Sequence, residues 1–117
     1  MPRQARLDAP GTLHHVIIRG IERKEIVKDD HDRQNFVYRM GTIALETGTL
    51  IYAWTLMTNQ AHIFLRNSSS GISLYMRRLL SGYAISYNRR HRRHGHLFQN
   101  RYKYIICSVE SCKAGPL

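Results

Sequence analysis

Two apolar runs joined by a short polar turn constrain the fold of this chain more than any other stretch. The runs are residues 50–57 and 61–65, and the turn between them is Thr58-Asn59. Both runs are rich in β-branched and aromatic residues, and a polar dipeptide between such runs is typical of a hairpin. The two runs are therefore predicted to be neighbouring antiparallel strands.

The second of these strands has two chemically different faces. Alternation along a strand places Gln60, His62 and Phe64 on one face, and Ile63 and Leu65 on the other. Helices that cover one side of the sheet would bury the apolar face and leave Gln60 and His62 on the open face. Two side chains with lone pairs, separated by one residue on a strand, can reach a single metal ion.

Hydrophobic periodicity predicts the remaining elements. Further strands are expected at residues 13–19 and 102–108, and amphipathic helices at residues 30–47 and 72–90. The order strand, helix, strand, strand, helix, strand corresponds to the ferredoxin-like α+β fold, an antiparallel sheet with helices on one face.

Local residues predict where the helices begin and end. Asp30 or Asp32 is expected to cap the first helix, and Gly48 is expected to end it. The loop at residues 67–71 is expected to supply the cap of the second helix, and Gly95 is expected to break that helix. A single domain over residues 1–117 is predicted, with its core at residues 10–108 and an atypical tail at residues 109–117.

Positive charge is concentrated in the second half of the chain. The formal net charge is +10, and residues 47–109 contain nine Lys or Arg and no Asp or Glu. An ordinary solvated surface mixes both signs, so this stretch favours a polyanionic partner, nucleic acid before membrane. The sequence has no signal peptide and no run of about 20 apolar residues, so a cytoplasmic location is expected.

A basic block at residues 88–103 is the predicted nucleic-acid contact. The candidate binding residues are Arg89, Arg90, Arg92, Arg93, His96, Phe98, Arg101 and Lys103. The cations would contact phosphates, and the interleaved rings would stack on bases. The alternative interpretation of the block is a solvated helix end.

Three segments carry a family resemblance. Residues 57–65 resemble the strand of the IS200-like single-tyrosine transposases that bears a His–hydrophobic–His motif. Residues 19–24 resemble the early R-G-N-x-R segment of the branch associated with repetitive extragenic palindromes, and residues 88–103 match the basic block of that branch. The resemblance runs from about residue 10 to residue 103, and the basic block is its most specific part.

The resemblance implies DNA transposition by metal-dependent cleavage and joining of a single strand. In such enzymes the two motif histidines hold Mg²⁺ or Mn²⁺. His62 matches the second histidine, and Gln60 stands at the first, where its amide oxygen still suits a hard cation. His15, on the predicted first strand, could neighbour this position, but an ordinary strand histidine is its favoured interpretation.

The resemblance also implies a tyrosine nucleophile on a helix beyond the basic block. No residue of this sequence matches it, so no catalytic residue is assigned and the chain is expected to be catalytically impaired, with an end that resembles a truncation or a frameshift. Tyr75, Tyr83 and Tyr87 are expected to be core residues of the second helix.

Three functions follow from these observations. The favoured one is an IS200-like transposase domain that binds single-stranded or hairpin DNA. A non-catalytic module that binds single-stranded nucleic acid is the alternative. A structural or protein-interaction domain is disfavoured by the acid-free basic stretch. The sequence determines neither the DNA target nor the oligomeric state.

Overall fold

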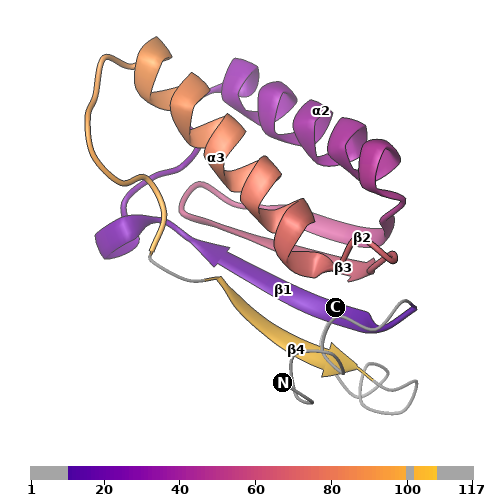
Figure 1. Cartoon of the computed structure of the whole chain (residues 1–117). Helices are drawn as coiled ribbons and strands as arrows, with labels where there is room; N and C mark the ends of the chain where they lie inside the picture. The colour runs from indigo at the N-terminus through magenta and orange to yellow at the C-terminus, as the bar shows by residue number, and fades with distance from the viewer. Residues whose placement is uncertain (1–10, 100–101, 108–117) are drawn as a thin grey trace.

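A computed structural model describes residues 11–99 and 102–107 of the chain. Its elements are β1 (Leu13–Arg19), the short 3-10 helix η1 (Ile21–Arg23), α2 (Asp30–Thr47), β2 (Leu50–Leu56), β3 (Gln60–Arg66), α3 (Ile72–Arg90) and β4 (Lys103–Cys107). The strands form one antiparallel sheet in the order β2-β3-β1-β4. Both long helices lie on the same side of this sheet (Figure 1). The predicted ferredoxin-like α+β fold is confirmed.

The sheet alternates as the sequence predicts. Along β3, Ala61, Ile63 and Leu65 are buried beneath the helices, whereas Gln60 and His62 are half-buried. β1 follows the same alternation. We call the side of the sheet that the helices leave uncovered the open face.

The edge strand β2 departs from this alternation. Its pairing with β3 shifts register between Ile51 and Ala53, as at a β-bulge. The ring of Tyr52 lies 5.9 Å from the ring of Phe64, and Tyr52 is 50% exposed. The neighbouring Trp54 is 48% exposed, so this edge presents aromatic surface to solvent.

Helix α2 begins and ends for identifiable reasons. Its N-cap is Asp29, whose Oδ1 accepts a hydrogen bond of 3.0 Å from the backbone N–H of Asp32. The sequence predicted Asp30 or Asp32 as the cap, and this was wrong, because the cap lies one residue before Asp30. Gly48 ends the helix as predicted, in the left-handed conformation (φ 74°) that glycine adopts without strain.

Helix α3 has its predicted bounds. Its N-cap is Gly71, which belongs to the predicted loop at residues 67–71 and makes no side-chain capping hydrogen bond. The helix stops at Arg90, where the N–H of His91 donates to the carbonyl of Tyr87, and Gly95 lies beyond that point. Among the described residues, neither α2 nor α3 combines the length and the apolar character needed to span a membrane.

The tyrosines of α3 connect it to the rest of the core. Tyr75 donates its hydroxyl to the carbonyl of Met40 at 2.9 Å, and Tyr83 donates to the carbonyl of Ile26. Both side chains are fully buried, as the sequence predicts, and burial raises the pKa of both phenols. Each hydroxyl thus satisfies a backbone carbonyl of another segment.

We expect Tyr83→Phe to lower the free energy of unfolding by about 1–2 kcal/mol, because the buried carbonyl of Ile26 loses its donor. Urea unfolding followed by circular dichroism measures the change. Tyr38→Phe is the matched control, since Tyr38 is 72% exposed on α2. Equal stability of the two variants would contradict the prediction.

Candidate nucleic-acid interface

Three distant segments meet at one end of the sheet. The N–H of Gly20, just after β1, donates to the carbonyl of Asn59 in the β2–β3 turn at 2.9 Å. The N–H of Gln99 donates to the carbonyl of Arg19 at 3.0 Å. These bonds bring together the three segments that carry the family resemblance, and the chain after α3 descends from the helix layer to the sheet at this same end (Figure 1).

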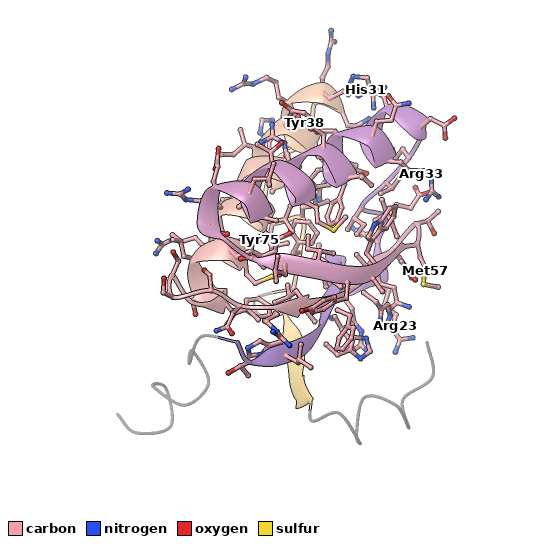
Figure 2. The ribbon with its side chains drawn as sticks, turned by 90° about the vertical axis from the view of Figure 1, so that its right-hand side faces the viewer. Arg23, His31, Arg33, Tyr38, Met57 and Tyr75 are labelled. Carbon is pink, nitrogen blue, oxygen red and sulfur yellow. The ribbon has the colours of Figure 1, made fainter. Side chains whose placement is uncertain are left out.

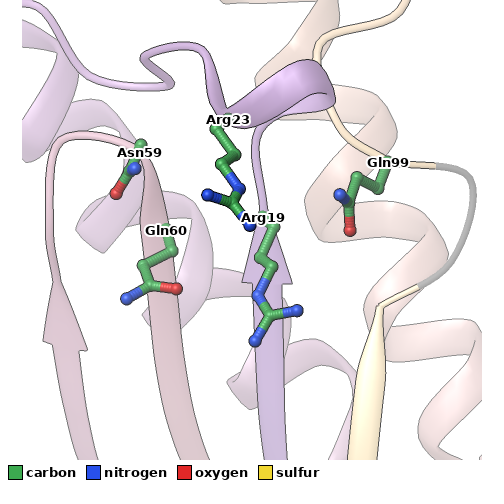
Figure 3. Close-up of a pocket in the computed structure, with 5 residues that line it drawn as sticks. All are labelled: Arg19, Arg23, Asn59, Gln60 and Gln99. Atoms are coloured by element: carbon green, nitrogen blue, oxygen red, sulfur yellow. The ribbon is translucent and has the colours of Figure 1, made fainter.

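A cavity of ≈ 360 Å³ opens where these segments meet. Its lining consists of two guanidinium groups and three carboxamides, from Arg19, Arg23, Asn59, Gln60 and Gln99 (Figure 3). We call it the arginine–amide cavity. None of the described residues that line it carries a carboxylate, so this lining is electropositive and rich in hydrogen-bond donors.

An unusual backbone turn holds Arg23 over this cavity. Glu22 and Arg23, in η1, both have positive φ angles, 52° and 61°. Such a conformation costs a non-glycine residue on the order of 1 kcal/mol or more. A side chain at Gly20 would place its Cβ 2.0 Å from the carbonyl oxygen of Lys24, so only glycine permits the turn to fold back this tightly.

His62 contacts His15, for which the sequence favoured an ordinary strand position. Its Nδ1 lies 3.1 Å from Nε2 of His15, which is on the neighbouring strand β1. Both rings line a second, smaller cavity of ≈ 110 Å³ on the open face, together with β2 residues and Phe64. Burial first, and then the nearby charges of His15 and Arg19, lower the pKa of His62.

The donor set around Gln60 does not fit a hard divalent cation. Gln60 lines the arginine–amide cavity and donates its amide N–H to the Met57 sulfur at 3.3 Å, whereas His62 lines the other cavity. Mg²⁺ prefers several oxygen ligands, and nearby guanidinium groups repel any cation. Among the described residues no three His, Cys, Asp or Glu gather as metal ligands would. The assignment of Gln60 and His62 to Mg²⁺ or Mn²⁺ stays a prediction.

Arg90 of the basic block is bound within the protein. Its guanidinium bridges Asp29 at 2.8 Å and Asp32 at 2.7 Å, and Asp32 also contacts Nε2 of His91 at 2.8 Å. Asp32 is only 1% exposed. The hydrogen bond from Arg90 is the main reason that the pKa of Asp29 lies well below its usual value. Arg90 therefore joins the end of α3 to the start of α2.

Two further members of the block make contacts within the protein. Phe98, expected to stack on bases, is only 9% exposed, and its ring lies 6.2 Å from the ring of Tyr83. That expectation is corrected, because a ring inside the core cannot stack on a base. Arg93 donates to Oδ1 of Asn88 at 2.6 Å and to the carbonyl of His96 at 3.2 Å, so it braces the turn after α3.

The remaining residues of the block are exposed, outside the described residues, or described only in their backbone. Arg89, Arg92 and His96 are exposed. Arg101 lies outside the described residues. Lys103 begins β4, where its backbone pairs with that of Ile17.

Comparison with known proteins identifies the family. The sequence profile described as "Transposase IS200 like" matches residues 10–114 of the chain. The chain belongs to the IS200-like transposase family. A comparison with curated proteins gave no match.

Solved structures share the fold of this IS200-like transposase chain. A REP-associated tyrosine transposase bound to a REP hairpin aligns with a TM-score of 0.75 at 10% identity, over 92% of this chain and 63% of that one. A Deinococcus radiodurans R1 protein described as a proposed transposase aligns with a TM-score of 0.67 at 16% identity, over 87% of this chain and 83% of that one. The chain thus spans less than two thirds of the length of the first structure.

Sequence reasoning assigned no role to four of the five residues that line the arginine–amide cavity. These are Arg19, Arg23, Asn59 and Gln99. The signal was present for the two arginines, because both lie in the segment at residues 19–24 that carries part of the family resemblance. Asn59 and Gln99 also lie in segments that carry the resemblance, residues 57–65 and 88–103, but only backbone hydrogen bonds to distant strand ends bring them to the site.

The bridge between Arg90 and the two aspartates predicts a specific dependence of stability on pH. The folded-state pKa of Asp29 is depressed, so its stabilising effect is present above the ordinary value of 3.8 and is lost as the pH falls toward the folded-state value. We expect the wild-type protein to have a higher free energy of unfolding in urea than Arg90→Gln at neutral pH. This difference in free energy should shrink below about pH 4. Arg77→Gln, on the exposed side of α3, is the control. A difference that does not change with pH would contradict this assignment.

Proposed function

We propose that this chain is a DNA-binding transposase domain that engages single-stranded or hairpin DNA. The observation that carries the proposal is the convergence of the three family segments on the arginine–amide cavity. Membership of the IS200-like family supports a role in DNA transposition. The similar fold of a REP-associated tyrosine transposase bound to a REP hairpin supports hairpin DNA as the partner.

The distribution of exposed cations supports a path for the DNA backbone. Arg89 and Arg92 are exposed at the end of α3, and Arg23 lines the cavity. The chain after α3 runs down to the end of the sheet beside η1 (Figure 1), and Gln99 in this stretch also lines the cavity. Cations spaced along one end of a protein can follow successive phosphates of one strand.

Exposed rings on the edge strand support a single-stranded partner. Tyr52 and Trp54 are each about half exposed, and the guanidinium of Arg66 lies 5.8 Å from the centre of the Tyr52 ring. Unpaired bases stack on such rings, whereas the bases of a duplex are already stacked on each other. An aromatic edge next to a cation therefore suits an unpaired nucleotide.

The three tyrosines of α3 favour binding over cleavage. Tyr75, Tyr83 and Tyr87 are buried, their hydroxyls donate to backbone carbonyls, and their pKa values are raised. A phenol needs access to the phosphate and a route to lose its proton before it can attack. Tyr38 is exposed, but it is on α2, on the opposite side of the sheet from the open face (Figure 2).

We expect Arg89→Ala/Arg92→Ala to weaken binding to a labelled DNA hairpin and to flatten its salt dependence. Each lost contact to a single-stranded phosphate should reduce the slope of log K against log salt by about 0.7. Fluorescence anisotropy at several salt concentrations measures both quantities.

The control for this experiment is Arg77→Ala/Arg78→Ala, which removes the same charge from the exposed side of α3. Equal slopes for the two double variants would mean that Arg89 and Arg92 do not contact the DNA. A matching RNA hairpin, used as competitor, separates the proposed function from a general module for single-stranded nucleic acid.

We also expect the 117-residue chain to form no covalent adduct with hairpin or single-stranded DNA in Mg²⁺ or Mn²⁺. The first reason is that no residue of the sequence matches the family's nucleophile, so exposed Tyr38 and Tyr52 are not in that position. The second is that the three tyrosines of α3 are buried and hydrogen-bonded, so they cannot reach a phosphate. Denaturing electrophoresis of labelled DNA after incubation is the measurement. An adduct mapped by mass spectrometry to any tyrosine of the chain would refute this expectation.

A further inference from the structure

We propose that the arginine–amide cavity is a phosphate-binding site, in which Arg19 and Arg23 supply the positive charge that a metal ion would otherwise supply. The ligand is a phosphate group of the bound polynucleotide, so the inference rests on the proposed function and specifies its chemistry. It concerns the position at Gln60, where the family resemblance implies a metal ligand.

Charge is the first argument for an anion. Two guanidinium groups share the lining of one cavity, and no carboxylate is among the described residues that line it. The nearest acid along the chain, Glu22, pairs instead with Lys24 at 3.4 Å. Two cations that face a common space repel each other, and a bound anion converts this repulsion into attraction.

The types of donor are the second argument. A guanidinium presents parallel N–H groups that match two phosphate oxygens, and each carboxamide adds further N–H donors. Figure 3 shows Arg19, Arg23 and Gln60 directed into the same space from β1, η1 and the start of β3. Among the described residues, the Gln60 amide group donates only to the sulfur of Met57. Sulfur is a weak acceptor, so a phosphate oxygen readily replaces it.

Preorganisation is the third argument. Backbone hydrogen bonds fix the segments on both sides of β1 that line the cavity. The N–H of Gly20 donates to the carbonyl of Asn59, and the N–H of Gln99 donates to the carbonyl of Arg19. The left-handed turn at Glu22 and Arg23 holds one guanidinium at the cavity despite its cost in backbone strain. Strain of this kind concentrates at functional sites, where it positions a ligand-binding group before the ligand arrives.

The size of the cavity favours a phosphate that is part of a larger molecule. At ≈ 360 Å³ it falls within the range of small-molecule pockets, which leaves room for the sugar that carries the phosphate. A phosphodiester within a DNA strand and a free or terminal phosphate share the same oxygen chemistry. We commit to the phosphodiester, because Arg89 and Arg92 lie on the same end of the protein and contact neighbouring phosphates in the proposed function.

The test begins with inorganic phosphate as the probe. Sodium phosphate is titrated into the isotopically labelled full chain against sodium chloride of equal ionic strength, and the side-chain N–H signals of Arg23, Asn59, Gln60 and Gln99 are followed by NMR. We expect saturable shifts at these signals with phosphate and not with chloride. Shifts that do not saturate, or that appear equally with chloride, would overturn the proposal.

Variants of Arg23 distinguish the contribution of the guanidinium geometry to phosphate binding from that of the positive charge alone. Arg23→Gln should weaken phosphate binding by about tenfold, and Arg23→Lys should recover only part of that loss, since lysine retains the charge without the fork. Arg77→Gln, which removes one charge from the solvent side of α3, should bind phosphate as wild type does. Backbone amide spectra verify that each variant is folded. Wild-type phosphate affinity in folded Arg23→Gln would overturn the proposal.

A divalent cation serves as the opposite probe. If Gln60 and His62 were metal ligands, Mn²⁺ at concentrations below those needed for phosphate would broaden their signals. We expect no such broadening at the Gln60 amide, because Arg19 and Arg23 repel the ion. Preferential broadening there would show a cation site and overturn the proposal.

Single-stranded DNA completes the test and separates the two proposals. We expect an oligonucleotide with a 5′-hydroxyl to displace inorganic phosphate and to bind Arg23→Gln more weakly than Arg77→Gln. Full DNA binding by Arg23→Gln would overturn the phosphate site and leave the proposed function intact. Failure of wild type to bind DNA at low salt would overturn the proposed function, even where inorganic phosphate still binds.

Discussion

The carboxylate of Asp32 is almost completely buried, so its charge must be balanced by hydrogen-bond donors from other segments of the chain. It accepts hydrogen bonds from the N–H of Lys28 and from Arg90, and it contacts His91. A buried charge that loses its partners is strongly destabilising, so the start of α2 and the end of α3 must stay together. This contact fixes the point from which the chain leaves the helix layer. The segment that reaches Gln99 and the cavity therefore begins from a fixed position.

The same contact divides the basic block by role. A run of arginines in a sequence looks uniform, but Arg90 neutralises buried acid and Arg93 braces the turn that follows. Arg89 and Arg92 remain exposed and available to an external anion. Net charge therefore predicts a class of partner, whereas it cannot separate cations available to a partner from cations that stabilise the fold.

The arrangement around Gln60 shows how one residue can change the chemistry of a site. An imidazole and a carboxamide differ little in size, but the carboxamide can donate as well as accept hydrogen bonds. With Arg19 and Arg23 on one side, Gln60 contributes to a lining suited to an anion. His62, one residue further on the same face, pairs with His15 in a separate cavity. Two positions that a strand places side by side thus face different chemical environments.

The sequence by itself determined the fold class, the bounds of both helices to within a residue, and the alternation of β3, because periodic burial of apolar side chains depends on local spacing. It also determined the family, through three short segments. Only the tertiary structure decided which polar side chains meet. Gln99, Asn59 and Arg23 come together through hydrogen bonds between strand ends that are far apart in the chain, and Phe98 turned inward for the same reason. Such pairings depend on long-range register, which no local pattern encodes.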